Sequence, residues 1–154
     1  GSASMSPNPE LTGNKEPCHT KLSWLQFQYK CNQFVGDALF MCGYKMPTYS
    51  MSDGSKHYMN AGSLIRQLDH FDVIDDILLL SRGDLLVIDY ESEFEEDRTH
   101  VEIITRLDLE HNILKSTGAH RDGVLEKDNS WVLQQKPSKK YQIYFLRPKL
   151  LLNQ

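Results

Sequence analysis

The sequence predicts an α+β domain in which helices come first and an antiparallel sheet follows. Residues 31–42 carry apolar side chains at the spacing of one helix face, and short β-rich segments recur from residue 85 to 146 between turn residues. The chain has 154 residues, of which 40% are hydrophobic and 25% charged, a composition typical of one compact domain. Helices grouped ahead of strands are typical of helices packed on one side of a sheet.

The predicted helices and strands follow from local patterns. The first helix spans residues 31–42 and ends at Gly43, a common C-terminal stop. Residues 46–63 are rich in Pro, Ser, Gly and Met and predict a long loop, and a short helix fits 61–70. Strands are expected at 85–89, 100–105, 112–117, 123–125 and 141–146.

The first sixteen residues differ in composition from the rest. Residues 1–4 resemble a cloning remnant, and residues 5–16 are rich in Pro, Asn and Ser. We therefore expect 1–16 to be a flexible N-terminus and 17–150 to form a single catalytic domain. We also expect that a signal peptide has been removed ahead of this start.

Charge and hydropathy exclude two classes of partner. The net charge is -4 and the pI is about 5.8, whereas nucleic-acid binding depends on clustered Lys and Arg. The longest apolar run, 77–80, is far shorter than the roughly 20 residues of a membrane-spanning helix. We expect neither a nucleic-acid partner nor a membrane span.

The three cysteines predict one disulfide and one free thiol. Within a helix over 31–42, Cys31 and Cys42 would lie about 16 Å apart along the axis, beyond the roughly 7 Å that a disulfide allows between Cα atoms. We therefore expect a disulfide between Cys18 and Cys42, with Cys31 left free. A disulfide also favours an exported, secreted protein.

Cys31 and His100 are the predicted catalytic pair. Cys31 is expected in the first helical turn, where the helix dipole favours an anionic nucleophile, and the backbone N–H of Asn32 would face an oxyanion. His100 begins an apolar strand and would act as the base. His120 and Ser116 are both candidates for a third group that orients His100. The other histidines show no metal-ligand spacing, so neither a metal nor a cofactor is expected.

Three motifs resemble those of NlpC/P60 and CHAP cysteine amidases. Cys31–Val35, with the sequence Cys-Asn-Gln-Phe-Val, resembles their nucleophile helix. Gly83–Val87 resembles the strand that these enzymes open with Gly-Asp, and His100–Ile104 is similar to their His-Val-x-Ile strand. A hairpin over 112–124 and a last strand over 141–148 follow in the same order, so the resemblance covers roughly 22–148.

This resemblance implies a papain-like NlpC/P60 fold and a covalent thiol mechanism without a cofactor. The implied reaction is hydrolysis of peptide bonds in bacterial peptidoglycan, in the stem peptide or at the D-Ala cross-link. The Cys-Asn-Gln-Phe-Val variant is closest to the amidase effectors of type VI secretion and to their animal-domesticated, secreted relatives. A bacterial effector would have an immunity protein as a further partner, whereas a domesticated enzyme would be a secreted antibacterial protein.

Two other functions remain open from the sequence. One is a catalytically silent module that binds the cell wall, and the other is a cysteine hydrolase or acyltransferase that acts on lipids or host proteins. In lipid-acting relatives the histidine commonly precedes the cysteine. Here Cys31 precedes His100, which favours the wall-directed branch, and the reactivity of Cys31 would separate an enzyme from a silent module.

Overall fold

The computed structural model describes residues 6–11, 27–90, 99–120, 122–134 and 141–150. Its helices and strands are α1 (Phe27–Met41), β1 (Thr48–Ser50), β2 (Lys56–Tyr58), α2 (Ala61–Leu64), β3 (Phe71–Val73), β4 (Leu85–Tyr90), β5 (Thr99–Asp108), β6 (Ile113–His120), β7 (Gly123–Asp128) and β8 (Tyr141–Pro148), with 3-10 turns η1 (Ile77–Leu79) and η2 (Ser130–Gln134). All strand pairs among them are antiparallel. The predicted α+β class is confirmed.

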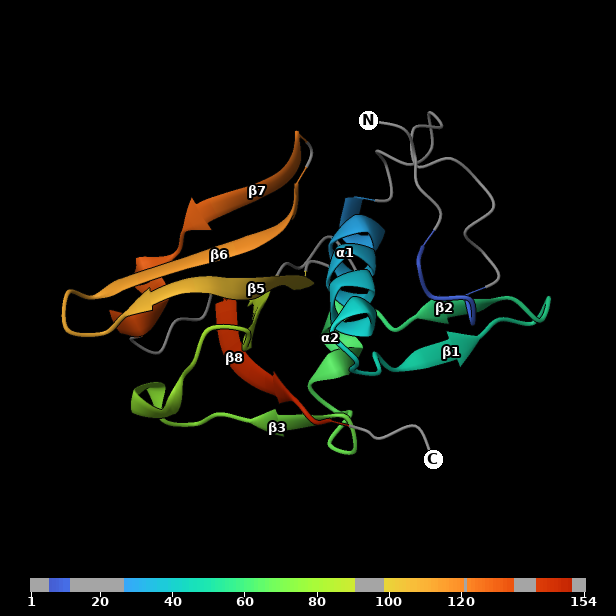
Figure 1. Ribbon diagram of the computed structural model, residues 1–154, viewed down its shortest axis with the longest axis horizontal. Coiled ribbons are helices and arrows are strands. Elements are labelled where there is room, and N and C mark those ends of the chain that lie inside the picture. The colour runs from blue at the N-terminus through green and yellow to red at the C-terminus, as the bar shows by residue number, and fades with distance from the viewer. Residues whose placement is uncertain (1–5, 12–26, 91–98, 121, 135–140, 151–154) are drawn as a thin grey trace.

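The main sheet has six strands in the order β3-β8-β4-β5-β6-β7. Strands β4 to β7 form a meander, and β8 returns to pair with β4 on its other side. Helix α1 stands beside this sheet, with the small β1–β2 hairpin on the far side of the helix (Figure 1). Four of the five strand segments expected from the sequence lie within observed strands, and the fifth, 112–117, begins one residue before β6.

Both faces of β4 are buried, which explains its continuous apolar sequence. Leu85 and Val87 share one core with residues of α1, while Leu86 and Ile88 point into a second core. The first core also contains Cys31, Val35, Leu39, Leu64, Phe71, Val101 and Leu146. The second contains Leu80, Ile104, Leu114, Val132, Leu133 and Phe145. Alternate side chains of β4 thus join two hydrophobic layers across a single sheet.

The predicted loop over 46–63 contains the β1–β2 hairpin, so this part of the prediction was wrong. The hairpin turns at Asp53 and Gly54, where the Asp53 carboxylate accepts the N–H of Ser55 at 2.9 Å and Gly54 has a φ of +87°. Both are favoured turn residues. Each strand is only three residues long, and so short a run carries little alternation for a sequence pattern to detect.

The predicted helix over 61–70 is also too long, since α2 ends at Leu64. Beyond it the chain turns through bonds such as Arg66 N–H to the Ser63 carbonyl, 3.2 Å, and enters β3 at Phe71. Phe71 is 1% exposed and pairs with Pro148 of β8. Burial of this aromatic ring in the sheet layer therefore takes precedence over continuation of the helix.

An ion pair between a buried carboxylate and a partly exposed arginine joins the start of β4 to the end of β8. Asp84 is 2% exposed, and both of its carboxylate oxygens accept hydrogen bonds from Arg147, each at 2.8 Å. The N–H of Ser81 donates to the same carboxylate at 2.8 Å. Gly83 precedes it with a φ of +93°, which glycine adopts without strain. The Gly-Asp and Arg-Pro motifs of the sequence therefore meet in space and have a structural role.

The described N-terminal segment, 6–11, packs against α1. Asn8 is buried, Leu11 packs against the first core, and the Ser6 hydroxyl donates to the carboxylate of Asp37. Burial raises the pKa of Asp37, although hydrogen bonds from Ser6 and Tyr58 partly oppose that effect. Residues 6–11 therefore contact the domain although they precede its expected start at residue 17.

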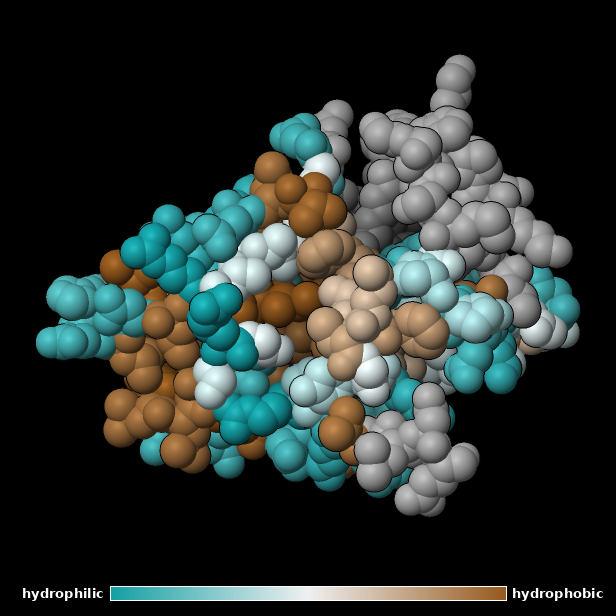
Figure 2. Space-filling model, viewed as in Figure 1, coloured by the Kyte–Doolittle hydropathy of each residue, from teal (hydrophilic) through white to brown (hydrophobic). Residues whose placement is uncertain are grey.

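The surface of the described residues combines charged strands with apolar areas. Figure 2 shows apolar side chains over η1 at the lower left, where Leu78 and Leu79 are exposed. No helix among the described residues combines the length and the apolar character that a bilayer-spanning helix requires.

Candidate functional site

Cys31 lies on α1 and is fully buried in the first core. It is the fifth residue of a helix that begins at Phe27, so it stands in the second turn and not in the first turn that the sequence predicted. The effect of the helix dipole falls off within the first turn. Activation of this thiol therefore depends on side chains around it more than on the helix end.

His100, the second residue of β5, is the side chain that contacts the Cys31 thiol. Its imidazole is hydrogen-bonded to Cys31, and its Nε2 meets the carboxylate of Glu102. Burial disfavours the imidazolium, but the hydrogen bonds and charges of Cys31 and Glu102 outweigh burial and raise the pKa of His100 to about 9. The structure thus brings the two predicted catalytic residues together.

Glu102 is a buried carboxylate that the sequence analysis did not single out. It is 2% exposed and follows His100 by two residues, so both side chains lie on the same face of β5. Burial opposes its ionisation, yet the hydrogen bond and charge of His100 outweigh burial and hold the pKa of Glu102 below its usual value. Glu102 therefore fixes the orientation of the imidazole as a carboxylate.

Ser116, one of the two candidate third groups, contacts Glu102 and not His100. Its hydroxyl donates to Glu102 Oε1 at 2.7 Å and accepts from the Asn129 amide at 2.7 Å. The hydroxyl is fully buried on β6. A continuous series of hydrogen bonds therefore runs from Asn129 through Ser116, Glu102 and His100 to Cys31.

His120, the other candidate, lies on the opposite side of the same carboxylate. Its Nε2 is 2.7 Å from Glu102 Oε2, but the contact lacks hydrogen-bond alignment, and this buried nitrogen has no hydrogen bond. Burial lowers the pKa of His120, and the charge of Glu102 offsets only part of that effect. Its ring centroid is 5.2 Å from that of His100. Both imidazoles therefore contact the same oxygen of Glu102.

Gly118 on β6 makes room for Glu102. A Cβ atom at position 118 would lie 2.6 Å from Cγ of Glu102 and 2.9 Å from its carboxyl carbon. Real Cβ atoms do not approach other atoms so closely, so any side chain at this position would displace the carboxylate. The absence of a side chain at Gly118 is thus part of what places Glu102 against His100.

Asn32 has a different role from the one predicted. As the sixth residue of α1 it lies in the helix interior, where the backbone N–H pairs with the carbonyl four residues earlier. This N–H is therefore engaged within the helix, in contrast to the free oxyanion donor that the sequence predicted. The Asn32 side chain donates to the carbonyl of Met59 at 2.8 Å and so links α1 to the segment after β2.

The predicted disulfide between Cys18 and Cys42 is absent. Cys42 is an exposed free thiol one residue beyond the end of α1, and Cys18 lies outside the described residues. Secretion, which the sequence analysis inferred in part from this disulfide, stays a prediction.

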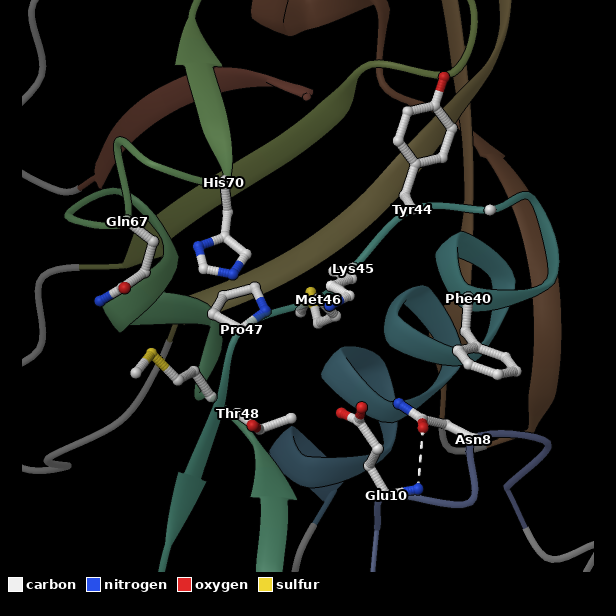
Figure 3. A pocket seen from close by; sticks show the side chains of 12 residues that line it. Asn8, Glu10, Phe40, Tyr44, Lys45, Met46, Pro47, Thr48, Gln67 and His70 are labelled. Carbon is white, nitrogen blue, oxygen red and sulfur yellow. Dashed lines mark hydrogen bonds between the residues drawn. The ribbon is translucent and has the colours of Figure 1, made fainter. Parts of the chain in front are cut away.

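A cavity of about 390 Å³ lies away from Cys31, at the other end of α1. Its lining includes Asn8 and Glu10 from the N-terminal segment, Phe40 from α1, and His70 from the turn before β3 (Figure 3). Phe40 is nine residues from Cys31, about 14 Å along a helix axis. Cys31 is not among the residues that line this cavity, so the candidate site is defined by the side chains around the thiol.

His100, Glu102 and His120 also form a donor set for a metal ion. One ligand atom of each lies within 4.8 Å of the others, and two imidazoles with a carboxylate suit a transition metal such as zinc. The sequence analysis found no such set because it compared the spacing of histidines and cysteines along the chain, whereas this set joins two neighbouring strands.

One further site residue, Glu102, could have been found from the sequence by a stricter use of strand geometry. In His100-Val101-Glu102, alternation places residues 100 and 102 on one face, so a carboxylate beside the imidazole was predictable. Asn129 lies between β7 and η2, and no local pattern signals its contact with Ser116.

Comparisons of the chain with protein-family models, with curated proteins and with solved structures find no match.

Proposed function

We propose that this chain is a cysteine hydrolase of the NlpC/P60 kind, with a papain-like arrangement of α1 on the antiparallel sheet. The observation that carries the proposal is the series Cys31, His100 and Glu102, in which a thiol on a helix meets an imidazole on a strand and a buried carboxylate holds that imidazole. Nucleophile, base and orienting group in hydrogen-bond contact are the arrangement that covalent catalysis requires.

In the proposed mechanism His100 takes the proton of the Cys31 thiol, which leaves a thiolate beside an imidazolium. The thiolate attacks the carbonyl carbon of an amide, and His100 gives its proton to the leaving amine as the C–N bond breaks. Water then attacks the resulting thioester while His100 takes its proton, and the C–S bond breaks, which releases the acid and restores the pair of Cys31 thiolate and His100 imidazolium. Glu102 stabilises the imidazolium at each stage. This sequence of steps uses no metal or cofactor.

Glu102 is the proposed orienting group in place of the two candidates that the sequence left open. Ser116 and His120 both contact Glu102, at 2.7 Å each, whereas Glu102 itself contacts Nε2 of His100. The identity of the substrate, peptide bonds of bacterial peptidoglycan, is supported by the ordered motifs of the sequence and by the order of Cys31 before His100.

The burial of Cys31 favours one competing function. A thiol with no exposed surface is also what a catalytically silent wall-binding module would have, because buried cysteines often act only as small apolar side chains. Catalysis requires that the side chains over Cys31 move aside when substrate binds. An enzyme and a silent module therefore differ in whether Cys31 reacts in the native protein.

The proposed function is tested by digestion of defined muropeptides, of both the diaminopimelate and the lysine type, with products followed by chromatography and mass spectrometry. We expect cleavage by the wild-type protein and by Cys42→Ser, and none by Cys31→Ala. Fragment masses would identify the bond. Equal cleavage by Cys31→Ala would contradict the thiol mechanism, and no cleavage by the wild type would favour the silent module.

A further inference from the structure

We infer that His100, Glu102 and His120 form a binding site for a zinc ion, and that zinc bound there blocks the base at position 100. The ligands are Nε2 of each imidazole and a carboxylate oxygen of Glu102, which all lie within 4.8 Å of one another. Two imidazoles and one carboxylate are a common donor set for zinc that keeps one position open to a further ligand.

The first support for this site is Nε2 of His120, which contacts Glu102 outside hydrogen-bond geometry. Nε2 of His120 is buried and has no hydrogen bond, although it lies 2.7 Å from Glu102 Oε2. A buried polar atom without a partner costs free energy, and in native structures it calls for an explanation such as an ion. A metal ion between the two imidazoles and the carboxylate would satisfy this nitrogen.

The surroundings of the carboxylate are the second support. Ser116 donates to Glu102 Oε1 at 2.7 Å and is itself held by Asn129, so Oε2 is the oxygen directed toward both imidazoles. Outer groups that orient a ligating carboxylate in this way are usual around protein metal sites. The ligating carboxylate is therefore held in position by buried side chains around it, as in established metal sites.

A second group of possible ligands is a useful contrast. Asp108, Glu110 and His111 also place ligand atoms within 4.8 Å of one another, but Glu110 and His111 are exposed to solvent. Nothing buried orients them, so they are not expected to hold an ion tightly. His111 therefore offers a matched control substitution.

The effect on catalysis rests on the proposed function, whereas zinc binding does not. Zinc on Nε2 of His100 occupies the lone pair of that nitrogen and leaves the ring proton on Nδ1. An imidazole in that state cannot accept the thiol proton, and the bound ion also takes Glu102 away from its role in holding an imidazolium. Zinc therefore competes with formation of the catalytic pair and acts as a reversible inhibitor.

The test is calorimetric titration of chelator-treated full-length protein with zinc, in a Cys18→Ser/Cys42→Ser background that removes the other two thiols. We expect one ion per chain, with affinity at least about tenfold weaker in His120→Gln and in Glu102→Gln. The His111→Gln and Cys31→Ala variants should retain the affinity. Unchanged affinity in both His120→Gln and Glu102→Gln, with native circular dichroism, would overturn the site.

The inhibitory effect is measured separately, by muropeptide cleavage with and without zinc in the wild-type protein. We expect zinc to stop cleavage and a chelator to restore it. Faster cleavage with zinc would overturn the inhibitory effect. If the wild type cleaves nothing but binds zinc as expected, the proposed function fails and the metal site stands, so the two failures are distinguishable.

Discussion

Glu102 contacts the imidazoles of His100 and His120 while only 2% of its own surface is exposed. A buried carboxylate between two imidazoles needs positive charge beside it, and His100 supplies that charge because its pKa is raised to about 9. The charge state of the proposed base therefore depends on Glu102 as well as on Cys31.

Replacement of Glu102 by Gln keeps the shape of the side chain and removes its charge. We expect the pKa of His100 to fall from about 9 toward its ordinary value of 6.5, because one of the groups that stabilise the imidazolium is lost. NMR titration of the His100 ring in chelator-treated protein measures this change. The same titration of Asp108→Asn, far along β5, is the control, and an unchanged His100 pKa in Glu102→Gln would contradict the arrangement.

The raised pKa of His100 also predicts how stability changes with pH. Because the folded-state pKa of about 9 exceeds the ordinary 6.5, the stabilisation from His100 is fully present below about pH 6.5 and is lost as the pH rises through about 9. Urea unfolding should therefore show wild type and His100→Gln differing most near pH 6.5 and converging toward pH 10. A difference that stays constant over this range would show that His100 is not an imidazolium in the fold.

Cys31 and His100 were predictable as a pair because each lies in a motif with a strong local pattern. Glu102 was missed because it was taken as one position of an apolar strand, although strand alternation places it beside His100. The role of Asn32 was mistaken for a different reason. Its N–H was expected to be free because the helix was expected to begin at residue 31, four residues after its actual start at Phe27.

The pairing of β5 with β6 brings four polar side chains together around one carboxylate. Strand β5 contributes His100 and Glu102, and β6 contributes Ser116 and His120. Gly118 stands opposite Glu102 in this pair, where a methyl group would lie 2.6 Å from Cγ of Glu102. Close strand pairing therefore requires glycine at this position if the carboxylate is to remain in place.

Substitution Gly118→Ala should displace Glu102 and so disturb the site more than the fold. Overpacking of this kind typically costs about 1–3 kcal/mol of unfolding free energy, and we expect at least tenfold slower alkylation of Cys31 because His100 loses its orienting carboxylate. Thr117→Ala is the control, since the Thr117 hydroxyl lies 2.9 Å from that of Thr105, away from Glu102. Wild-type Cys31 reactivity in Gly118→Ala would contradict this role.

Strands were easier to predict than short helices and hairpins. β4, β5 and β8 have six or more residues, enough to show apolar runs bounded by turn residues. The β1–β2 hairpin and β3 have three residues in each strand and are defined by their pairing partners, which a local pattern does not contain. The end of α2 was also misplaced, because it depends on the burial of Phe71 against β8, a contact between distant segments that a local pattern does not contain.

The ion pair between Asp84 and Arg147 connects residues 63 positions apart and closes the middle of the main sheet. It involves the Gly-Asp and Arg-Pro motifs, which therefore indicate how the sheet is assembled and do not form part of the reactive site. The N–H of Gly83 and the carbonyl of Asp84 also bond to Ile104, each at 2.8 Å, so the pair holds three strands in register.

Replacement of Asp84 by Ala removes this anchor and leaves the Arg147 guanidinium without its buried partner. We expect a loss of about 2–3 kcal/mol in unfolding free energy, since hydrogen bonds to charged groups contribute that much. Lys149→Ala is the matched control, because its 3.6 Å contact with Asp72 lies on the surface and is expected to contribute about 0–1 kcal/mol. Urea unfolding measures both, and equal losses would contradict the structural role of the pair.

The proposal as a whole depends on whether a fully buried thiol is nonetheless a nucleophile. Cys42 offers an internal reference, since it is an exposed free thiol in the same molecule. The measurement is the rate of iodoacetamide alkylation at each cysteine, followed by peptide mass spectrometry in native, chelator-treated wild type and in His100→Gln. We expect Cys31 to react faster than Cys42 in the wild type and to lose that advantage in His100→Gln. If Cys31 reacts more slowly than Cys42 in both proteins, its burial is structural and the proposed thiol mechanism is wrong.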